Sequence, residues 1–228
     1  MPGCDRTNWQ LHWLEAEGDL GPWRARIASE IAAARLAIAT VLPPPRVDIL
    51  IQHLAGRVIE EIGMAGHAYR RGLFGLTLDP GNPHFAESLA NGTLRRQVAH
   101  EAHHCLRMAA VGYGRTLGEA LVSEGLAGCF VSHLFGTPPE PWERAVACET
   151  LRAFRPDPAA LSAAGYDHAG WFFGAGGRYP RWLGYTLGYR IVGDWLAATP
   201  GATAEAWVGV PAGDVLDAAR AGMLADIR

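Results

Sequence analysis

Residues 100–104 read His-Glu-Ala-His-His, and this pentapeptide constrains the fold more than any other part of the sequence. On an α-helix, two residues four positions apart project from the same face, about one turn from each other. His100 and His104 can therefore direct their imidazole nitrogens at one point if the surrounding chain is helical. The pattern of residues from Thr93 to Ala110 predicts such a helix.

The spacing of the two histidines indicates a zinc site, because nitrogens one helical turn apart can take neighbouring corners of a tetrahedron. Glu101 lies one position further round the helix, where its carboxylate can reach a metal-bound water from the side. We therefore predict His100 and His104 as zinc ligands and Glu101 as the general base. His103 points elsewhere on the helix, and we expect it to be solvated or to serve in packing.

The identity of a third ligand separates the classes of protein that carry this motif. Metzincins need glycine at position 107 and histidine at position 110, but this chain has Arg107 and Ala110, which excludes that class. Another large class takes a glutamate from a following helix. Glu124 stands twenty residues after His104, in a second helical pattern. A turn before that helix would form a helical hairpin and bring Glu124 back beside the histidines.

The motif and the Ser-Glu-Gly-Leu-Ala segment around Glu124 together resemble the gluzincins, which include thermolysin-like and aminopeptidase-like zinc peptidases. More narrowly, the chain resembles a family of small bacterial predicted Zn-dependent proteases, the YjaZ-like family, over about residues 45–200. The matching segments are Val98–His104, Glu119–Ala127, Trp171–Gly174 and Pro180–Val192. The resemblance implies zinc, peptide-like substrates and a cleft between two lobes.

Four further residues are candidates for supporting roles. Glu119 is a rival third ligand; alternatively it accepts a hydrogen bond from a ligand imidazole and fixes its tautomer, or is a plain surface glutamate. Amide hydrolysis also benefits from a donor to the developing oxyanion, which in gluzincins is commonly a tyrosine or histidine of the C-terminal lobe. Tyr185, Tyr189 and His168 are the candidates for this donor. The alternative for both tyrosines is an ordinary packing role in the core.

Strand patterns come early in the chain and helical patterns come later. We expect helices at 23–42, 93–110, 117–134, 141–154, 181–198 and 214–224, and strands at 47–51 and 73–78; the stretch 52–71 fits either a helix or a strand. This order predicts an α+β, zincin-like fold, with a small mixed sheet in an N-terminal lobe packed on a mostly helical C-terminal lobe.

In this interpretation residues 1–22 form an N-terminal arm, and residues 23–228 form one domain with lobes at 23–114 and 115–228. The active-site cleft would lie between the lobes. The strand at 73–78 could be an open edge that pairs with a substrate backbone, or an ordinary interior strand.

Charge and composition restrict the partners. A net charge of −3 and a pI near 6.3 provide no basic surface for a nucleic acid or an anionic membrane. The N-terminus has no apolar signal-peptide core, Cys4 follows no hydrophobic stretch that would suit a lipid anchor, and the apolar segment 27–42 is too short to span a bilayer. These features favour a cytoplasmic protein.

The remaining cysteines, Cys105, Cys129 and Cys148, have no CxxC spacing, so we expect free thiols that pack as small buried hydrophobic groups.

The predicted function is that of a gluzincin-type zinc metallopeptidase, in which a zinc-activated water cleaves peptide bonds of a peptide or protein substrate. The alternative is a non-catalytic zincin-like module that binds a peptide or protein. The presence of Glu101 and the lack of a fourth cysteine or histidine at a suitable spacing favour the enzyme. The physiological substrate, the choice between internal and terminal cleavage, and the oligomeric state are not specified by the sequence.

Overall fold

The computed structural model describes residues 9–220 and 222, so that Cys4 and the end of the helix expected at 214–224 lie outside the described residues. The chain forms two compact units, Met1–Ala109 and Ala110–Arg228. All of the described strands belong to the first unit, and the described part of the second unit is helical, which confirms the α+β prediction. None of the helices in the described ranges has the length and apolar character needed to cross a membrane.

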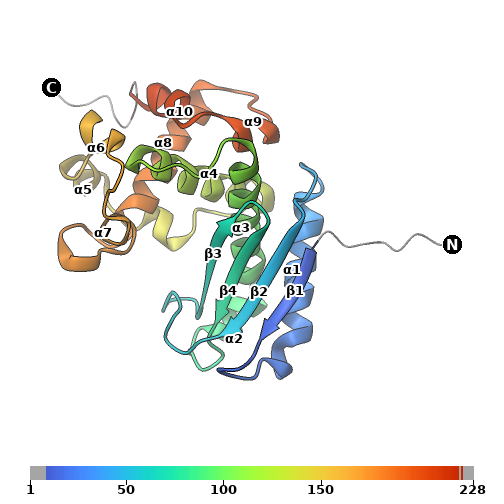
Figure 1. Ribbon diagram of the computed structural model, residues 1–228. Coiled ribbons are helices and arrows are strands. Elements are labelled where there is room, and N and C mark those ends of the chain that lie inside the picture. Colours follow the sequence, from blue (N-terminus) through green and yellow to red (C-terminus); the bar gives the residue numbers. More distant parts are fainter. Residues whose placement is uncertain (1–8, 221, 223–228) are drawn as a thin grey trace. The chain divides into compact units, whose positions relative to one another are not determined.

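The first unit contains a four-stranded mixed sheet with the order β1-β2-β4-β3 (Figure 1). Its strands are β1 (Trp9–Leu14), β2 (Val47–His53), β3 (Met64–Arg70) and β4 (Leu73–Leu78). Strand β2 pairs in parallel with both β1 and β4, and β3 pairs antiparallel with β4. Strands β1 and β3 are therefore the edges of the sheet, and β4 is an interior strand.

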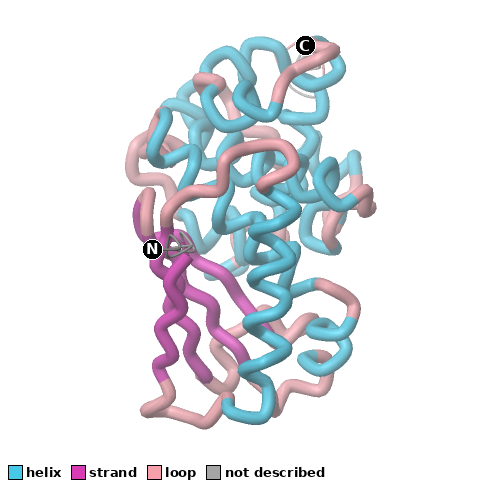
Figure 2. The backbone as a smooth tube through the Cα atoms, turned by 90° about the vertical axis from the view of Figure 1, so that its right-hand side faces the viewer, coloured by secondary structure: helices cyan, strands magenta, loops and turns pink. Residues whose placement is uncertain are grey.

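The core of this unit lies between the sheet and its helices. In β2, alternate side chains are buried because successive residues of a strand point to opposite faces, and Val47, Ile49 and Ile51 are at most 2% exposed. Helix α1 (Arg24–Ile38) buries an apolar row at helical spacing against this core. Figures 1 and 2 show the helices of the unit on one side of the sheet.

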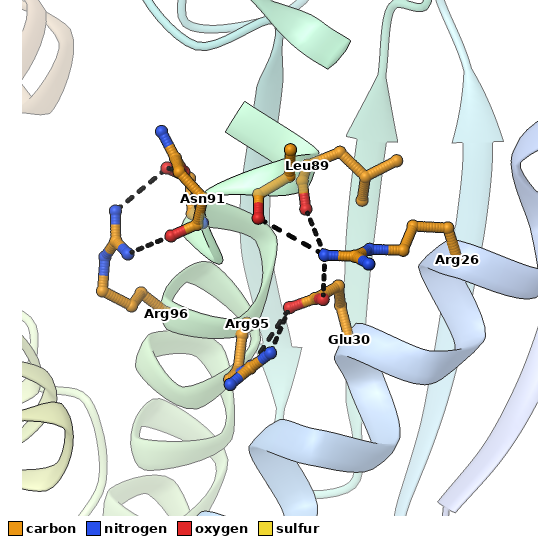
Figure 3. Close-up of polar contacts among 8 residues, drawn as sticks. Arg26, Glu30, Leu89, Asn91, Arg95 and Arg96 are labelled. Atoms are coloured by element: carbon orange, nitrogen blue, oxygen red, sulfur yellow. Dashed lines mark hydrogen bonds and ion pairs between the residues drawn. The ribbon is translucent and has the colours of Figure 1, made fainter. Parts of the chain in front are cut away.

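A buried carboxylate joins α1 to α3 (Thr93–Ala110), the helix that carries the histidine motif (Figure 3). The side chain of Glu30 is 3% exposed and accepts hydrogen bonds from Arg95 Nε at 3.0 Å, while Arg26 lies 3.0 Å from its other oxygen. Arg26 also donates to the carbonyls of Leu89 and Ala90, at the end of helix α2 (Phe85–Ala90). This network fixes the first turns of α3 relative to α1 and α2.

Helices make up the second unit. They are α4 (Leu117–Phe135), α5 (Cys148–Ala153), α6 (Pro158–Ser162), α7 (His168–Phe173), α8 (Leu183–Ala198), α9 (Ala204–Gly209) and α10 (Ala212–Ala219), with 3₁₀ turns at Pro141–Arg144 and Ala175–Gly177. Helices α4 and α8 pack along each other, and α10 contacts both of them.

Two glycines allow the backbones of α4 and α8 to approach closely. A Cβ atom at Gly125 would lie 2.1 Å from the carbonyl oxygen of Gly188, and one at Gly188 would lie 2.3 Å from the carbonyl oxygen of Leu121. Real Cβ atoms do not approach backbone oxygens this closely, so any larger residue at either position would push the helices apart. Glycine at these positions therefore sets the distance between the helix that carries Glu124 and the helix that carries Tyr185.

Several predicted elements match the structure, and others do not. Helix α3 has the predicted bounds, α4 differs by one residue at its end, and the ambiguous stretch contains strand β3. Residues 9–14, assigned to an N-terminal arm, form strand β1 instead. Residues 141–154 do not form one helix, because the chain is extended at Ala147, between the 3₁₀ turn and α5.

Two further expectations about burial and pairing are resolved. The strand at 73–78 is paired on both sides, so its interpretation as an open edge is wrong and the interior alternative holds. Cys105 and Cys129 are buried as expected, but Cys148 is exposed, because it begins the short helix α5 and does not lie inside a long one.

We predict that Gly125→Ala destabilises the protein by about 1–3 kcal/mol, because the added methyl group has no space against α8. Gly193→Ala is the matched control: it lies on α8 with no atom within 4 Å of the added Cβ, so it should stabilise the helix by about 0.5–1 kcal/mol. Urea unfolding of both variants measures the difference. Equal stabilities for the two variants would contradict the close contact.

Candidate metal centre

His100 and His104 direct their imidazole nitrogens at each other from one face of α3. Their Nε2 atoms are 3.0 Å apart, the ring centroids are 4.7 Å apart, and the rings are inclined at 82°. Two nitrogens that each bind a tetrahedral zinc at its usual distance would be about 3.3 Å apart. Both side chains are buried, with exposed fractions of 9% and 4%. The pair therefore has the donor chemistry and the spacing that a zinc ion requires.

Glu101 lies against the edge strand β3, at a position where the strand has no side chain. A Cβ atom at Gly66 would be 2.4 Å from Oε1 of Glu101 and 2.6 Å from its Cγ. The space that the Glu101 carboxylate occupies thus exists because residue 66 is glycine. Glu101 is also close to Cys105, whose thiol pKa is raised to about 12 by burial and by the negative charge of Glu101.

His103 is fully buried, at 0% exposure, so a solvated role for this residue is wrong and a packing role remains. Arg107, four residues later on the same helix, is 2% exposed. All four polar residues between positions 100 and 104 are thus buried, although such side chains are ordinarily exposed: His100, Glu101, His103 and His104.

Glu124 lies in the buried middle of α4, with 8% of its surface exposed. The helix begins with a capping box: the Thr116 side chain accepts a hydrogen bond from the backbone N–H of Glu119. In return, the Glu119 carboxylate accepts hydrogen bonds from the backbone N–H groups of Arg115 at 2.7 Å and Thr116 at 2.9 Å. These contacts give Glu119 a helix-capping role, and its roles toward a metal remain predictions.

Tyr113 holds the Glu124 carboxylate from the segment that precedes α4. Its hydroxyl donates a hydrogen bond to Oε1 of Glu124 at 2.5 Å, and its carbonyl oxygen accepts one from Ser123 Oγ at 2.8 Å. Burial and the adjacent Glu124 raise the pKa of Tyr113 well above its usual value. Tyr113 therefore stays protonated and able to donate over the physiological pH range.

Two of the predicted oxyanion donors belong to a group of aromatic residues near Tyr113. Tyr185, on α8, packs at the edge of Phe172 with ring centroids 5.0 Å apart, and it interacts electrostatically with Tyr113. His168 stacks on Phe172 at 4.5 Å, and its Nδ1 lies 3.1 Å from the hydroxyl of Tyr166. Burial, followed by the charges of glutamates 124 and 119, raises the pKa of Tyr166 to about 12.

Tyr189 has different surroundings. Its hydroxyl donates to Ser132 Oγ at 3.3 Å, and its pKa is raised by burial, with smaller contributions from Cys129 and Glu143. These neighbours lie on α4 after Glu124 and in the 3₁₀ turn that follows the helix. Its described contacts are those of the packing alternative.

Three residues with contacts to the candidate site residues were absent from the sequence prediction. Gly66 gave no signal, because the strand that contains it was ambiguous in sequence. Tyr113 lies between Gly112 and Gly114, which have positive φ angles of 88° and 104°. In sequence, such a glycine-rich stretch indicates a turn but gives no role for the side chain within it. Tyr166 lies in a loop without any periodic pattern.

These features define an α+β protein in which an HExxH helix packs beside a mixed sheet. Comparison with protein-family models identifies residues 29–217 with the family described as "Predicted Zn-dependent protease (DUF2268)", and since this match covers most of the sequence, the chain belongs to that family. The predicted resemblance is confirmed at this level. Searches of curated proteins and of solved structures find no match.

We predict that Glu119→Ala lowers the free energy of unfolding of the metal-free protein by about 1 kcal/mol, because it removes half of the capping box of α4. Thr116→Ala should have a similar effect, and the double variant should lose less than the sum, since both residues serve the same cap. Urea unfolding measures all three, with Glu60→Ala, at an exposed site, as the control. An unchanged stability in Glu119→Ala would contradict the capping role.

Proposed function

We propose that this protein is a zinc-dependent peptidase in which His100, His104 and Glu124 bind one zinc ion. One donor atom from each of these residues makes a set that could hold a metal ion, and such a set leaves a coordination position for water or substrate. The observation that carries the proposal is the convergence of the two Nε2 atoms at 3.0 Å on a buried helix face. Membership of the family of predicted Zn-dependent proteases supports it.

Zinc would supply Lewis acidity, which polarises a carbonyl group and lets a water lose its proton near neutral pH. Glu101 accepts that proton as the water attacks the carbonyl carbon, and then transfers it to the nitrogen of the leaving amine. The Glu101 carboxylate occupies the space that Gly66 leaves on β3, which supports this role. Tyr185 and His168 remain candidates to donate to the oxyanion.

The edge strand β3 supports a peptide as the substrate class. Within the described part of the chain, no strand pairs with the outer side of β3 between Ala65 and Tyr69, so its backbone groups there can pair with an extended chain. Gly66 lies on this stretch and contacts Glu101, so a peptide added to the edge would pass close to the proposed base. Pairing of an open strand edge with a substrate backbone, considered above for residues 73–78, is thus assigned to β3.

The proposal is tested by elemental analysis of the purified protein and by cleavage of a mixed-peptide library with and without a chelator. We expect one zinc per chain and cleavage that the chelator abolishes and added zinc restores. His100→Ala combined with His104→Ala should lose zinc, whereas His84→Ala, at an exposed histidine outside the motif, should retain it. Zinc retained in the double variant would refute the ligand assignment.

Glu101→Gln separates catalysis from metal binding, because the amide keeps the shape of the side chain but cannot accept the proton. We predict unchanged zinc content and a fall in the cleavage rate of about 10²- to 10⁴-fold. Zinc binding without cleavage by the parent protein would favour the alternative of a non-catalytic peptide-binding module. Cleavage by Glu101→Gln at the parental rate would show that another group is the base.

Glycine at position 66 should matter to catalysis more than to folding. We predict that Gly66→Ala lowers kcat by about 10²-fold while zinc content stays the same, because the new Cβ displaces the Glu101 carboxylate. Gly72→Ala, where the nearest atom is 3.5 Å from the added Cβ, is the control on the same hairpin. In the Glu101→Gln background the Gly66→Ala change should have little further effect. An equal loss in both backgrounds would show that the defect does not act through Glu101.

A further inference from the structure

We infer that Tyr113 is a positioning residue for the metal centre, which holds the Glu124 carboxylate in the orientation needed to bind zinc. This inference rests on the proposed function, and it concerns a residue that sequence motifs do not identify. The carrying observation is the hydrogen bond of 2.5 Å from the Tyr113 hydroxyl to Oε1 of Glu124.

A glutamate side chain has three rotatable bonds, so a ligand glutamate loses conformational entropy when it binds a metal. A hydrogen bond to one carboxylate oxygen reduces the entropy that is lost on metal binding, because it already fixes the plane of the carboxylate in the metal-free protein. The bond from Tyr113 is made to Oε1. One carboxylate oxygen of Glu124 can therefore accept the hydrogen bond while the other binds a metal, which favours binding of the metal through a single oxygen.

Tyr113 is itself held at both ends by residues that are adjacent on α4. Its hydroxyl bonds to Glu124, and its carbonyl oxygen accepts the hydrogen bond from Ser123. The glycines on either side, Gly112 and Gly114, have φ angles of 88° and 104°, which other residues rarely adopt. The backbone turn thus directs the phenol ring back along the helix that follows it.

The carboxylate of Glu119, the rival third ligand, is engaged at the start of α4. The Glu119 carboxylate is occupied by the backbone N–H groups of residues 115 and 116 and by the Thr116 hydroxyl at 3.0 Å. Glu119 therefore secures the start of α4, and Tyr113 orients the carboxylate one and a half turns further along. Tyr113, in the glycine-rich turn before α4, orients the proposed ligand through its hydroxyl.

The test is zinc affinity, measured by competition with a chromogenic chelator, in the full chain. Tyr113→Phe removes only the hydroxyl, and we expect zinc to bind about 10- to 100-fold more weakly while the metal-free protein stays folded. Tyr179→Phe is the matched control, since Tyr179 stacks on Trp171 at 4.3 Å in the same unit. The control should bind zinc as the parent does.

A double-mutant cycle separates positioning from a general structural effect. In the Glu124→Ala background, Tyr113→Phe should leave the residual zinc affinity unchanged, because there is no carboxylate to orient. The cobalt-substituted protein gives a second measure: Tyr113→Phe should change its visible absorption bands, which report on the ligand geometry, and Tyr179→Phe should not.

The outcomes distinguish this inference from the proposed function. A parent protein that binds zinc through its histidines, together with parental affinity in Tyr113→Phe, overturns the role of Tyr113 alone. An equal loss of affinity in the Glu124→Ala background also overturns it, since the effect then does not act through the carboxylate. A parent protein that binds no zinc overturns the proposed function and this inference together.

Discussion

Helix α3 must bury polar as well as apolar side chains, and the rest of the structure depends on how this is done. Its apolar row of Leu94, Val98 and Cys105 is fully buried, while His100 and Glu101 are also enclosed. Burying such groups costs free energy of several kcal/mol unless they find polar partners. The fold therefore surrounds this helix with features that hold or accommodate its polar groups, such as the salt-bridged Glu30 at its start and the glycine on β3.

Much of the fold could be predicted from the sequence, because the long helices carry strong periodic patterns. The bounds of α3 follow from its pattern, and α4 follows from a helical pattern that begins after a turn. Strand β1 was missed although apolar and polar residues alternate from Trp9 to Trp13, because its partner in the sheet is distant in sequence: it pairs with β2 from Trp9↔Val47 onward. Strand order is a long-range property, which also explains why β4 could not be recognised as an interior strand.

The candidate site was predictable where it depends on spacing along one helix, and not where it depends on the backbone of another element. His100 and His104 converge because they are four residues apart, and this requires no knowledge of the fold. The contact of Gly66 with Glu101 depends on the register of β3 beside α3, which the sequence does not specify. Likewise the bond from Tyr113 to Glu124 requires the turn between two glycines with positive φ angles. The assignment of Glu124 as the third ligand remains a prediction.

The glycine contact between α4 and α8 also determines how these two helices can be aligned. Next to Gly188 in the sequence stand Leu187 and Tyr189, and both are much larger. If α8 slid along α4 by one residue, a bulky side chain would meet the carbonyl oxygen of Leu121, where even a methyl carbon would lie at 2.3 Å. A shift of the helix pair by one residue is thus sterically disfavoured. The alignment of Tyr185 with Glu124, on the two helices, therefore follows from where these glycines stand in the sequence.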